Sequence, residues 1–333
     1  TIIKDVRVLA PAIRKAFRQA QTGRPGPVLL DVTKDVTAAV TEFYPVEADP
    51  VPRQSHTIRQ EDLDQALEML EAAERPFVFA GGGVISSGAS EELTELVHRL
   101  DAPITCTLMG QGAFDQADEA YTGMLGMHGT KTSNLGVTAC DLLIGVGVRF
   151  SDRCTGDPKT FAHHAKILQL DVDEAEVNKN VHVDAAVIGD LKLVLQKLNA
   201  RLKQQHHPEW NEKIQGLKKQ YPLACPEDVL TGPYVIRKLS EITQGNAIIT
   251  TDVGQHQMWT AQFYTFRKPR TFLSSGGLGT MGYGVGASIG AKFGRPEELV
   301  GDISGDGWFR MNMNELAQIS DNGVVFEVKK DYA

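Results

Sequence analysis

The chain has 333 residues, 42% of them hydrophobic and 23% charged, which is typical of a globular protein with about two domains and excludes a disordered chain. Its net charge of −8 argues against nucleic acid and against an anionic membrane surface as partners. Because no apolar run reaches the roughly 18 residues of a membrane helix and no signal-like segment is visible, we expect neither a membrane span nor a signal peptide.

The four cysteines, Cys106, Cys140, Cys154 and Cys225, form no CxxC pair. This spacing favours reduced thiols in a cytoplasmic protein over a disulfide framework or a zinc site. The chain opens at Thr1 without a methionine and leads directly into the amphipathic stretch AIRKAFRQA. We interpret this opening as part of a longer protein.

Residues 1–45 predict a helix that ends at Gly23, a Gly-Pro turn at 24–27 and a buried strand at 28–32. A polar run with three prolines between residues 44 and 59 predicts an interdomain linker.

Residues 60–203 alternate short apolar runs with helical patterns, which is typical of a parallel α/β sheet. The predicted strands are 76–80, 103–107, 141–146 and 167–172, and the predicted helices include 91–99 and 191–203. A polar bridge at 204–212 leads to a third unit over 214–333, with a helix at 234–242, strands at 247–251 and 298–303, and a glycine-rich segment at 274–290.

The turn Ser304-Gly305-Asp306-Gly307 follows the last of these strands and precedes a helical pattern. Its glycines let the backbone present N–H groups to an anion, and Asp306 offers an oxygen ligand for Mg²⁺. The carboxyl end of a strand is also where open α/β sheets bind ligands. A tight turn with a solvated Asp explains the motif equally simply when it is taken alone.

Two further segments of the third unit accompany this turn. VGQHQMW, at 253–259, places Gln255 and His256 after another strand, where they suit diphosphate oxygens. SGGLGTMGYG, at 275–284, lets a flat ring approach the backbone while Met281 supports it. A flexible loop is the alternative for the glycine-rich segment, although its apolar content argues against it.

Together the three segments resemble the diphosphate-binding domain of thiamine-diphosphate enzymes, and specifically the acetolactate synthase family. The resemblance extends over nearly the whole chain, beginning with RPGPVLLDVTKDV at 24–36. It implies an α/β fold made of the tail of the pyrimidine-binding domain (1–45), a central FAD-binding-like domain (60–203) and part of the thiamine-diphosphate domain (214–333).

The resemblance implies that thiamine diphosphate and Mg²⁺ bind in the third unit. The residues carried over for thiamine diphosphate are Gly254, Gln255, His256, Gly279, Met281, Gly305 and Gly307. Asp306 and Asn322 would bind the metal ion.

The middle unit resembles the family's FAD-binding domain, in which the flavin is mainly structural. The implied flavin contacts are Arg24, Gly81, Gly82, Gly83, Thr107, Leu108, Leu125, Met127, His128, Gly147, Arg149, Arg153, Asp171, Val172 and Asp190. From the residues alone, Met127 and His128 read more simply as a core thioether and a buried imidazole, and Arg149 and Arg153 as solvated charges.

Three departures from the family pattern stand out. The family's catalytic glutamate lies outside this chain, so we expect the chain by itself to be inactive. Trp308 stands where the family commonly has a small residue after Gly-Asp-Gly. Asn322 follows Asp306 sooner than the family's spacing predicts, by about one buried strand.

The function that this resemblance implies is the decarboxylating condensation of two pyruvates, or of pyruvate with 2-oxobutyrate, to 2-acetohydroxy acids in branched-chain amino-acid biosynthesis. It also implies a homodimer or higher homo-oligomer and a small regulatory subunit. Another thiamine-diphosphate lyase, such as glyoxylate carboligase or oxalyl-CoA decarboxylase, is the enzymatic alternative. A non-catalytic dinucleotide-binding module is the alternative from another class.

Overall fold

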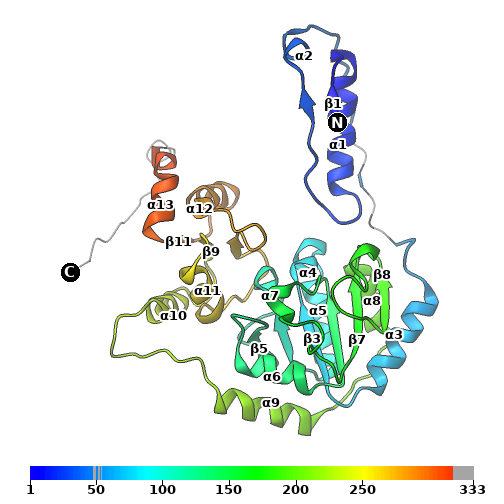
Figure 1. Cartoon of the computed structure of the whole chain (residues 1–333), viewed down its shortest axis with the longest axis vertical. Helices are drawn as coiled ribbons and strands as arrows, with labels where there is room; N and C mark the ends of the chain where they lie inside the picture. The colour runs from blue at the N-terminus through cyan, green and yellow to red at the C-terminus, as the bar shows by residue number, and fades with distance from the viewer. Residues whose placement is uncertain (48–49, 52, 54, 318–333) are drawn as a thin grey trace.

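The computed structural model of the chain describes residues 1–47, 50–51, 53 and 55–317. Three units follow one another: an N-terminal unit (residues 1–47), a central unit (60–220) and a C-terminal unit (231–317) (Figure 1). The central and C-terminal units are each built on a parallel sheet flanked by helices, which confirms the predicted α/β class.

In the N-terminal unit a helix is followed by a turn and an extended segment, and two very short strands, β1 (Ile2–Ile3) and β2 (Asp31–Val32), pair in parallel. Its helices are η1 (Val6–Val8), α1 (Leu9–Gln21) and α2 (Lys34–Ala38). The prediction of a buried strand over 28–32 is wrong, because Val28 is 37% and Leu29 78% exposed. Among the described residues β2 pairs only with β1, so no wider sheet covers these side chains.

The central unit contains a six-stranded parallel sheet in the order β5-β4-β3-β6-β7-β8. The strands are β3 (Pro76–Ala80), β4 (Ile104–Cys106), β5 (Tyr121–Met124), β6 (Leu142–Val146), β7 (Lys166–Asp171) and β8 (Ala185–Ile188). The chain starts in the middle at β3, builds outward to β5, and then returns to the other side of β3. The gap between the carboxyl ends of β3 and β6 is therefore a topological switch point, where such sheets bind ligands.

Helices cover both faces of this sheet. They are α3 (Gln60–Ala72), α4 (Gly82–Ser87), α5 (Ser90–Leu100), η2 (Leu108–Gly110), α6 (Lys131–Ala139), α7 (Asp152–Thr155), η3 (Glu174–Glu176), α8 (Leu191–Asn199) and α9 (Pro208–Gln220). Side chains alternate along β3, so that Val78 and Ala80 join one apolar cluster while Phe77 and Phe79 join the other. Burial on both faces explains why the strands read as continuous apolar runs.

Helix α9 occupies part of the segment for which we predicted a polar bridge. Its buried side chains, Trp210 and Ile214, are four residues apart and therefore share one face. The Trp210 indole donates a hydrogen bond to the Pro76 carbonyl at 2.9 Å and meets the Phe77 ring edge-on. The helix thus packs on the central unit, and the connection to the C-terminal unit begins after Gln220.

The C-terminal unit has a three-stranded parallel sheet in the order β10-β9-β11. Its elements are α10 (Gly232–Thr243), β9 (Ile248–Thr251), α11 (Gln255–Phe263), β10 (Phe272–Ser274), α12 (Tyr283–Gly294), β11 (Val300–Ile303), α13 (Asp306–Met311) and η4 (Met313–Glu315). The switch point here lies between β9 and β11. Among the described helices, none has both the length and the apolar content to cross a bilayer.

Candidate active site

A pocket of about 1810 Å³ opens between the carboxyl edge of the central sheet and the C-terminal unit. All three units line it: Arg24 from the N-terminal unit, the glycine turn after β3, and Gly254 and Gly279 from the C-terminal unit. The switch point of the central sheet and the carboxyl ends of β9 and β10 therefore contribute to one cavity, which is large enough for ligands of cofactor size.

The turn at residues 81–83 packs against the end of β6 at Gly147. A Cβ built on Gly81 would lie 2.3 Å from the Gly147 carbonyl oxygen, and one on Gly83 would lie 2.7 Å from the Gly147 Cα. The backbone is also bonded there, since Gly81 N donates to Val146 O at 2.9 Å. No side chain fits at Gly81 or Gly83, so bare backbone forms the pocket wall at the switch point.

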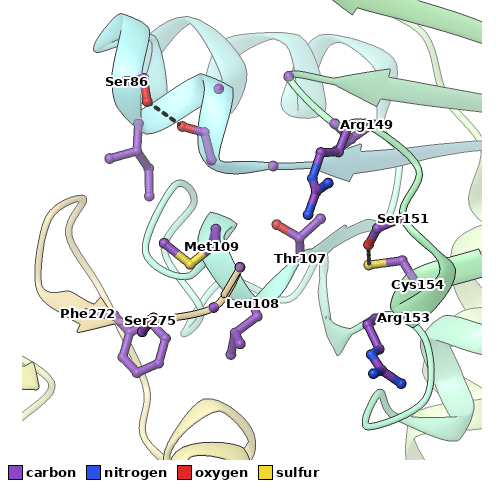
Figure 2. A pocket seen from close by; sticks show the side chains of 18 of the residues that line it. Ser86, Thr107, Leu108, Met109, Arg149, Ser151, Arg153, Cys154, Phe272 and Ser275 are labelled. Atoms are coloured by element: carbon purple, nitrogen blue, oxygen red, sulfur yellow. Dashed lines mark hydrogen bonds between the residues drawn. The ribbon is translucent and has the colours of Figure 1, made fainter. Parts of the chain in front are cut away.

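Two arginines border the pocket beside this turn (Figure 2). Both Arg149 and Arg153 are exposed, and backbone contacts fix their places in the loop. The Arg149 carbonyl accepts a hydrogen bond from Asn180 Nδ2 at 2.9 Å, and the Arg153 carbonyl accepts one from Met127 N at 2.9 Å. Two cationic side chains are thus free to meet an anionic ligand in the pocket.

The loop at residues 125–129 lies against Arg153, but its two central side chains do not enter a core. Met127 is 64% exposed and His128 is exposed as well. The interpretation of these two residues as a core thioether and a buried imidazole is therefore wrong. The cause is Gly126, whose φ of +101° turns the chain outward. His128 lines the pocket and Met127 does not.

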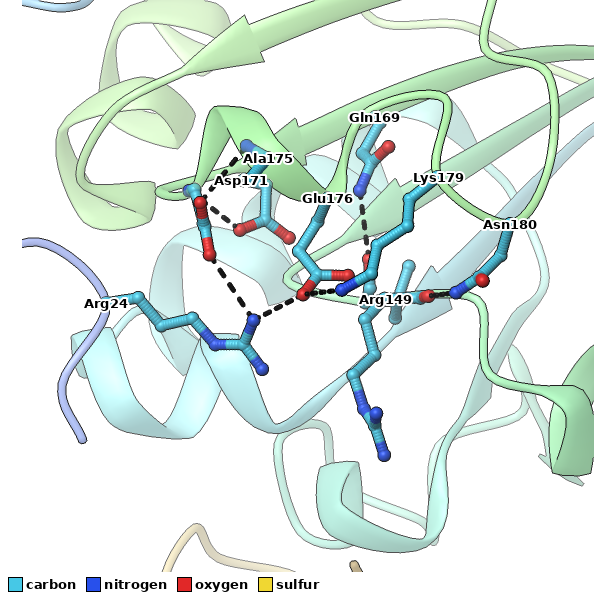
Figure 3. A network of polar contacts seen from close by, with 10 residues as sticks. Arg24, Arg149, Gln169, Asp171, Ala175, Glu176, Lys179 and Asn180 are labelled. Atoms are coloured by element: carbon cyan, nitrogen blue, oxygen red, sulfur yellow. Dashed lines mark hydrogen bonds and ion pairs between the residues drawn. The ribbon is translucent and has the colours of Figure 1, made fainter. Parts of the chain in front are cut away.

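Beside Arg149 lies a network of charged side chains around Glu176, which lines the same pocket (Figure 3). Arg24 Nη1 lies 2.5 Å from Glu176 Oε1 and 3.4 Å from Asp173 Oδ2, and Lys179 Nζ lies 3.0 Å from Glu176 Oε1. Burial alone would raise the pKa of Glu176, but the hydrogen bonds from Lys179 and Arg24 lower it overall. Arg24, predicted as a flavin cation, is thus paired with an acid that the sequence analysis did not single out.

Two further acids, Asp171 and Asp190, line the pocket. Burial raises the pKa of Asp171, although the backbone N–H groups of Asp173 and Val172 partly offset it. Asp190 caps α8 and forms an ion pair with Arg53 at 2.8 Å. With Val172 also on the pocket wall, the structure gathers fourteen of the fifteen predicted flavin residues around one cavity and leaves out Met127.

The residues predicted for thiamine diphosphate are only partly gathered. Gly254, Gln255 and Gly279 line the pocket, whereas His256, Met281, Gly305 and Gly307 lie off its walls. Met281 is 52% exposed. Burial lowers the pKa of His256, with Asp252 partly offsetting this, and its buried Nε2 has no hydrogen-bond partner in the described structure.

The predicted metal ligands cannot both be placed. Asp306 is exposed at the start of α13, whereas Asn322 lies outside the described residues. Within the described part of the chain, no three His, Cys, Asp or Glu side chains come close enough together to hold a metal ion. Mg²⁺ commonly uses one or two carboxylates and completes its shell with ligand phosphates and water, which suits a lone Asp306.

Beneath the ends of β9 and β11 lies a polar network that the sequence analysis missed. Ser304 Oγ is 3.0 Å from Asp252 Oδ2 and 2.6 Å from Asp302 Oδ2, while Thr250 Oγ1 donates to Asp302 Oδ1 at 2.8 Å. One hydroxyl has one proton and cannot donate to both carboxylates. A protonated Asp302 that donates to Ser304 resolves the conflict, because Ser304 then donates to Asp252.

Raising the pH is expected to destabilise the C-terminal unit through Asp302. Burial raises the pKa of this carboxyl, and the bonds from Ser304 and Thr250 offset only part of the rise. The folded state therefore holds the proton of Asp302 more tightly than the unfolded chain does. The protonated carboxyl stabilises the fold fully at a pH below its ordinary pKa of 3.8, and this stabilisation is lost as the pH rises through the raised pKa of the folded state. Asp302→Asn should flatten this dependence in urea unfolding measured across a pH series.

His256, the other titrating group whose pKa is shifted at this switch point, contributes with the opposite sign. Its pKa is lowered, so its contribution to stability is lost as the pH falls. His256 is present in both wild type and Asp302→Asn, so the difference between their free energies of unfolding isolates the contribution of Asp302. A difference that stays constant across the pH series would contradict the assignment.

The wall between the two halves of the pocket contains two residues that the sequence analysis did not single out, Met109 and Arg270. A Cβ on Gly276 would lie 2.4 Å from Met109 Sδ and 3.2 Å from Leu108 Cδ2, and one on Gly82 would lie 3.2 Å from Met109 Cβ. Figure 2 shows Leu108 and Met109 beside the segment that carries Ser275. Arg270 adds a bond across the units, from Nη2 to the Ile85 carbonyl at 3.2 Å.

Comparison with known proteins relates this arrangement to one enzyme family. Residues 63–198 match the thiamine pyrophosphate enzyme central domain, and residues 252–328 match the C-terminal TPP-binding domain of the same enzymes. The chain is 42% identical to "Acetolactate synthase 2, chloroplastic" of Nicotiana tabacum, covering 96% of this chain and 49% of that protein.

Similar relatives occur in other kingdoms. "Probable acetolactate synthase large subunit" of Methanocaldococcus jannaschii is 44% identical over 96% of this chain and 57% of its own length. "Acetolactate synthase large subunit" of Corynebacterium glutamicum is 42% identical over 95% of this chain and 52% of its own length. The chain thus spans about half the length of the curated relatives it matches.

Proposed function

This chain belongs to the thiamine-diphosphate enzymes, and we propose that the protein containing it is the catalytic subunit of an acetolactate synthase. The proposed reaction condenses two pyruvates, or pyruvate with 2-oxobutyrate, to a 2-acetohydroxy acid and CO₂ in branched-chain amino-acid biosynthesis. The observation that carries the proposal is the pocket that the carboxyl ends of strands from both sheets share. Such an arrangement suits two cofactors that lie side by side.

The C-terminal half of the site fits thiamine diphosphate. The unpartnered Nε2 of His256 lies among the residues assigned to the diphosphate, where an anionic oxygen would satisfy it. Gly254 and Gln255 would offer backbone N–H groups at the start of α11, and Asp306 would bind Mg²⁺. When bound, thiamine diphosphate supplies the nucleophile for the 2-keto acid and accepts the electrons that decarboxylation releases.

The central half fits FAD. The bare backbone at Gly81–Gly83 and Gly147 allows a flat or phosphorylated ligand to approach closely. Arg149 and Arg153 would balance the negative charge of the ligand, and Asp171 would accept hydrogen bonds from a ribose. Thr107, Leu108, Leu125, His128, Val172 and Asp190 would complete the contacts from the pocket wall.

We also propose a homo-oligomer with a small regulatory subunit, located in the cytoplasm. Val235, Ile242 and Phe293 on the C-terminal unit are 50%, 80% and 58% exposed, which suits a surface that another chain covers. All four cysteines are free, as expected in a reducing compartment.

The decisive experiment combines binding with turnover. The whole protein that contains this chain, once purified, should contain flavin by its absorption spectrum, should bind thiamine diphosphate with Mg²⁺ by calorimetry, and should convert pyruvate to acetolactate with release of CO₂. Flavin content separates the synthase from flavin-free lyases. Failure to bind thiamine diphosphate would instead support the non-catalytic dinucleotide-binding module, which the position of Trp308 beside the site favours.

A further inference from the structure

Trp308 lies between the two turns that would hold the diphosphate. It belongs to the first turn of α13, and its Nε1 donates a hydrogen bond to the Val253 carbonyl, the residue before Gly254. A Cβ built on Gly254 would lie 3.7 Å from Trp308 Nε1, and one built on Gly305 would lie 3.7 Å from Trp308 Cδ1. The indole therefore closes the gap between the ends of β9 and β11.

The His256 ring fills the remainder of this gap. The same two Cβ positions lie 3.1 Å and 3.5 Å from His256 Cε1. Because burial lowers the pKa of His256, its ring is predominantly neutral at pH 7, and its Nε2 is buried without a partner. A buried, unpaired ring nitrogen costs free energy that a polar ligand would recover. The orphaned atom thus points to a ligand, while the neighbouring indole stands in the ligand's way.

We propose that Trp308 is a movable cap on the diphosphate end of the thiamine-diphosphate site, an inference that rests on the proposed function. Gly254 and Gln255 already line the pocket, so a diphosphate can bridge them to the turn at Gly305 only after the indole leaves Val253. The first turn of α13 borders open space, since a Cβ on Gly307 would meet no atom within 4 Å. The closed cap lowers the apparent affinity by the fraction of molecules that are open.

The test uses Trp308→Ser in the purified protein, with three probes titrated by calorimetry. Thiamine diphosphate with Mg²⁺ and inorganic diphosphate with Mg²⁺ are each expected to bind about tenfold more tightly than to wild type, which corresponds to about 1.4 kcal/mol. Thiamine alone, which lacks the diphosphate, is expected to bind equally to both proteins. This contrast distinguishes a cap over the diphosphate from a general loosening of the site.

Trp308→Phe serves as the second variant because it keeps an aromatic ring and removes only the N–H donor. It should bind both diphosphate probes about threefold to fivefold more tightly, since a typical hydrogen bond contributes about 1 kcal/mol. This variant decides the question if Trp308→Ser unfolds. The matched control is Met313→Ser, which removes a 47% exposed apolar side chain from the same segment and should leave all three affinities unchanged.

Equal or weaker diphosphate binding by both Trp308 variants would overturn the cap while leaving the proposed function intact. If wild type and variants all fail to bind thiamine diphosphate with Mg²⁺ at millimolar concentration, the proposed function and the cap both fall. A tighter affinity that extends equally to thiamine alone also overturns the cap.

Discussion

Replacing Gly284 by alanine is expected to lower the free energy of unfolding of the C-terminal unit by about 3 kcal/mol. Gly284 lies in the first turn of α12, directly against the polar network beneath the switch point. Its added Cβ would lie 2.5 Å from Asp302 Oδ1, 2.8 Å from Ser304 Oγ and 3.0 Å from Asp252 Oδ2. Any shift that relieves these contacts breaks buried hydrogen bonds of two carboxyl groups.

Gly286→Ala is the matched control, two residues further along the same helix. A Cβ there meets no atom within 4 Å, so alanine should be neutral or stabilise by up to about 1 kcal/mol through its higher helix propensity. Urea unfolding followed by tryptophan fluorescence reports the difference, because Trp259 and Trp308 both lie in this unit. Equal stability of the two alanine variants would refute the packing of Gly284 on the carboxyl network.

Asp306→Ala is expected to weaken Mg²⁺-dependent binding of thiamine diphosphate by about 100-fold or more. Even residues that only support metal ligands change metal affinity by about 10-fold to 100-fold, and Asp306 is the proposed ligand itself. Its carboxylate is exposed at the start of α13, and no three His, Cys, Asp or Glu side chains among the described residues form an alternative site for the metal. Calorimetric titration of thiamine diphosphate at several Mg²⁺ concentrations measures the loss.

Without Mg²⁺ the wild type and Asp306→Ala should bind thiamine diphosphate with the same low affinity. Glu315→Gln, which removes one negative charge from the same segment, controls for the change in net charge and should retain the Mg²⁺ response. If Asp306→Ala responds to Mg²⁺ as the wild type does, the metal is bound elsewhere, and the assignment of the turn after β11 is lost.

Strands with a long apolar run were predictable, and short ones only in part. β3 has the predicted bounds because five buried residues follow one another, while β6 differs from prediction by one residue at its start and β7 by one residue at each end. The short strands β4 and β9 were predicted, but the sequence analysis missed β5, β8 and β10. The missed strands have only three or four residues, and β5 also contains a glycine, so that local pattern separates strands of this kind from loops only in some cases.

Helix α9 escaped prediction for a related reason. Its thirteen residues contain eight polar or charged side chains, and only Trp210 and Ile214 are buried. A pair of apolar residues four positions apart is a weak signal. What stabilises the helix is the groove on the central unit that accepts the indole, and that groove exists only after the sheet has formed.

The residues of the candidate site were likewise predictable only in part. Glycine turns after strands predict a ligand pocket because they combine local geometry with a place at the sheet edge, as at Gly81 and Gly254. The hydrogen bond from Ser304 to Asp252 joins residues 52 positions apart, and the sequence around either residue does not predict the other as its partner. The outward path of Met127 likewise depends on the φ of Gly126, which the sequence permits without requiring.

The wall formed by Leu108 and Met109 touches both halves of the pocket. Met109 lies against the turn at Gly82 on one side and the segment at Gly276 on the other. If the two halves bind flavin and thiamine diphosphate as proposed, any factor that flavin adds to the affinity for thiamine diphosphate must equal the factor that thiamine diphosphate adds to the affinity for flavin. A flavin without a redox task would then still contribute to catalysis, through the free energy with which it holds the neighbouring site in shape.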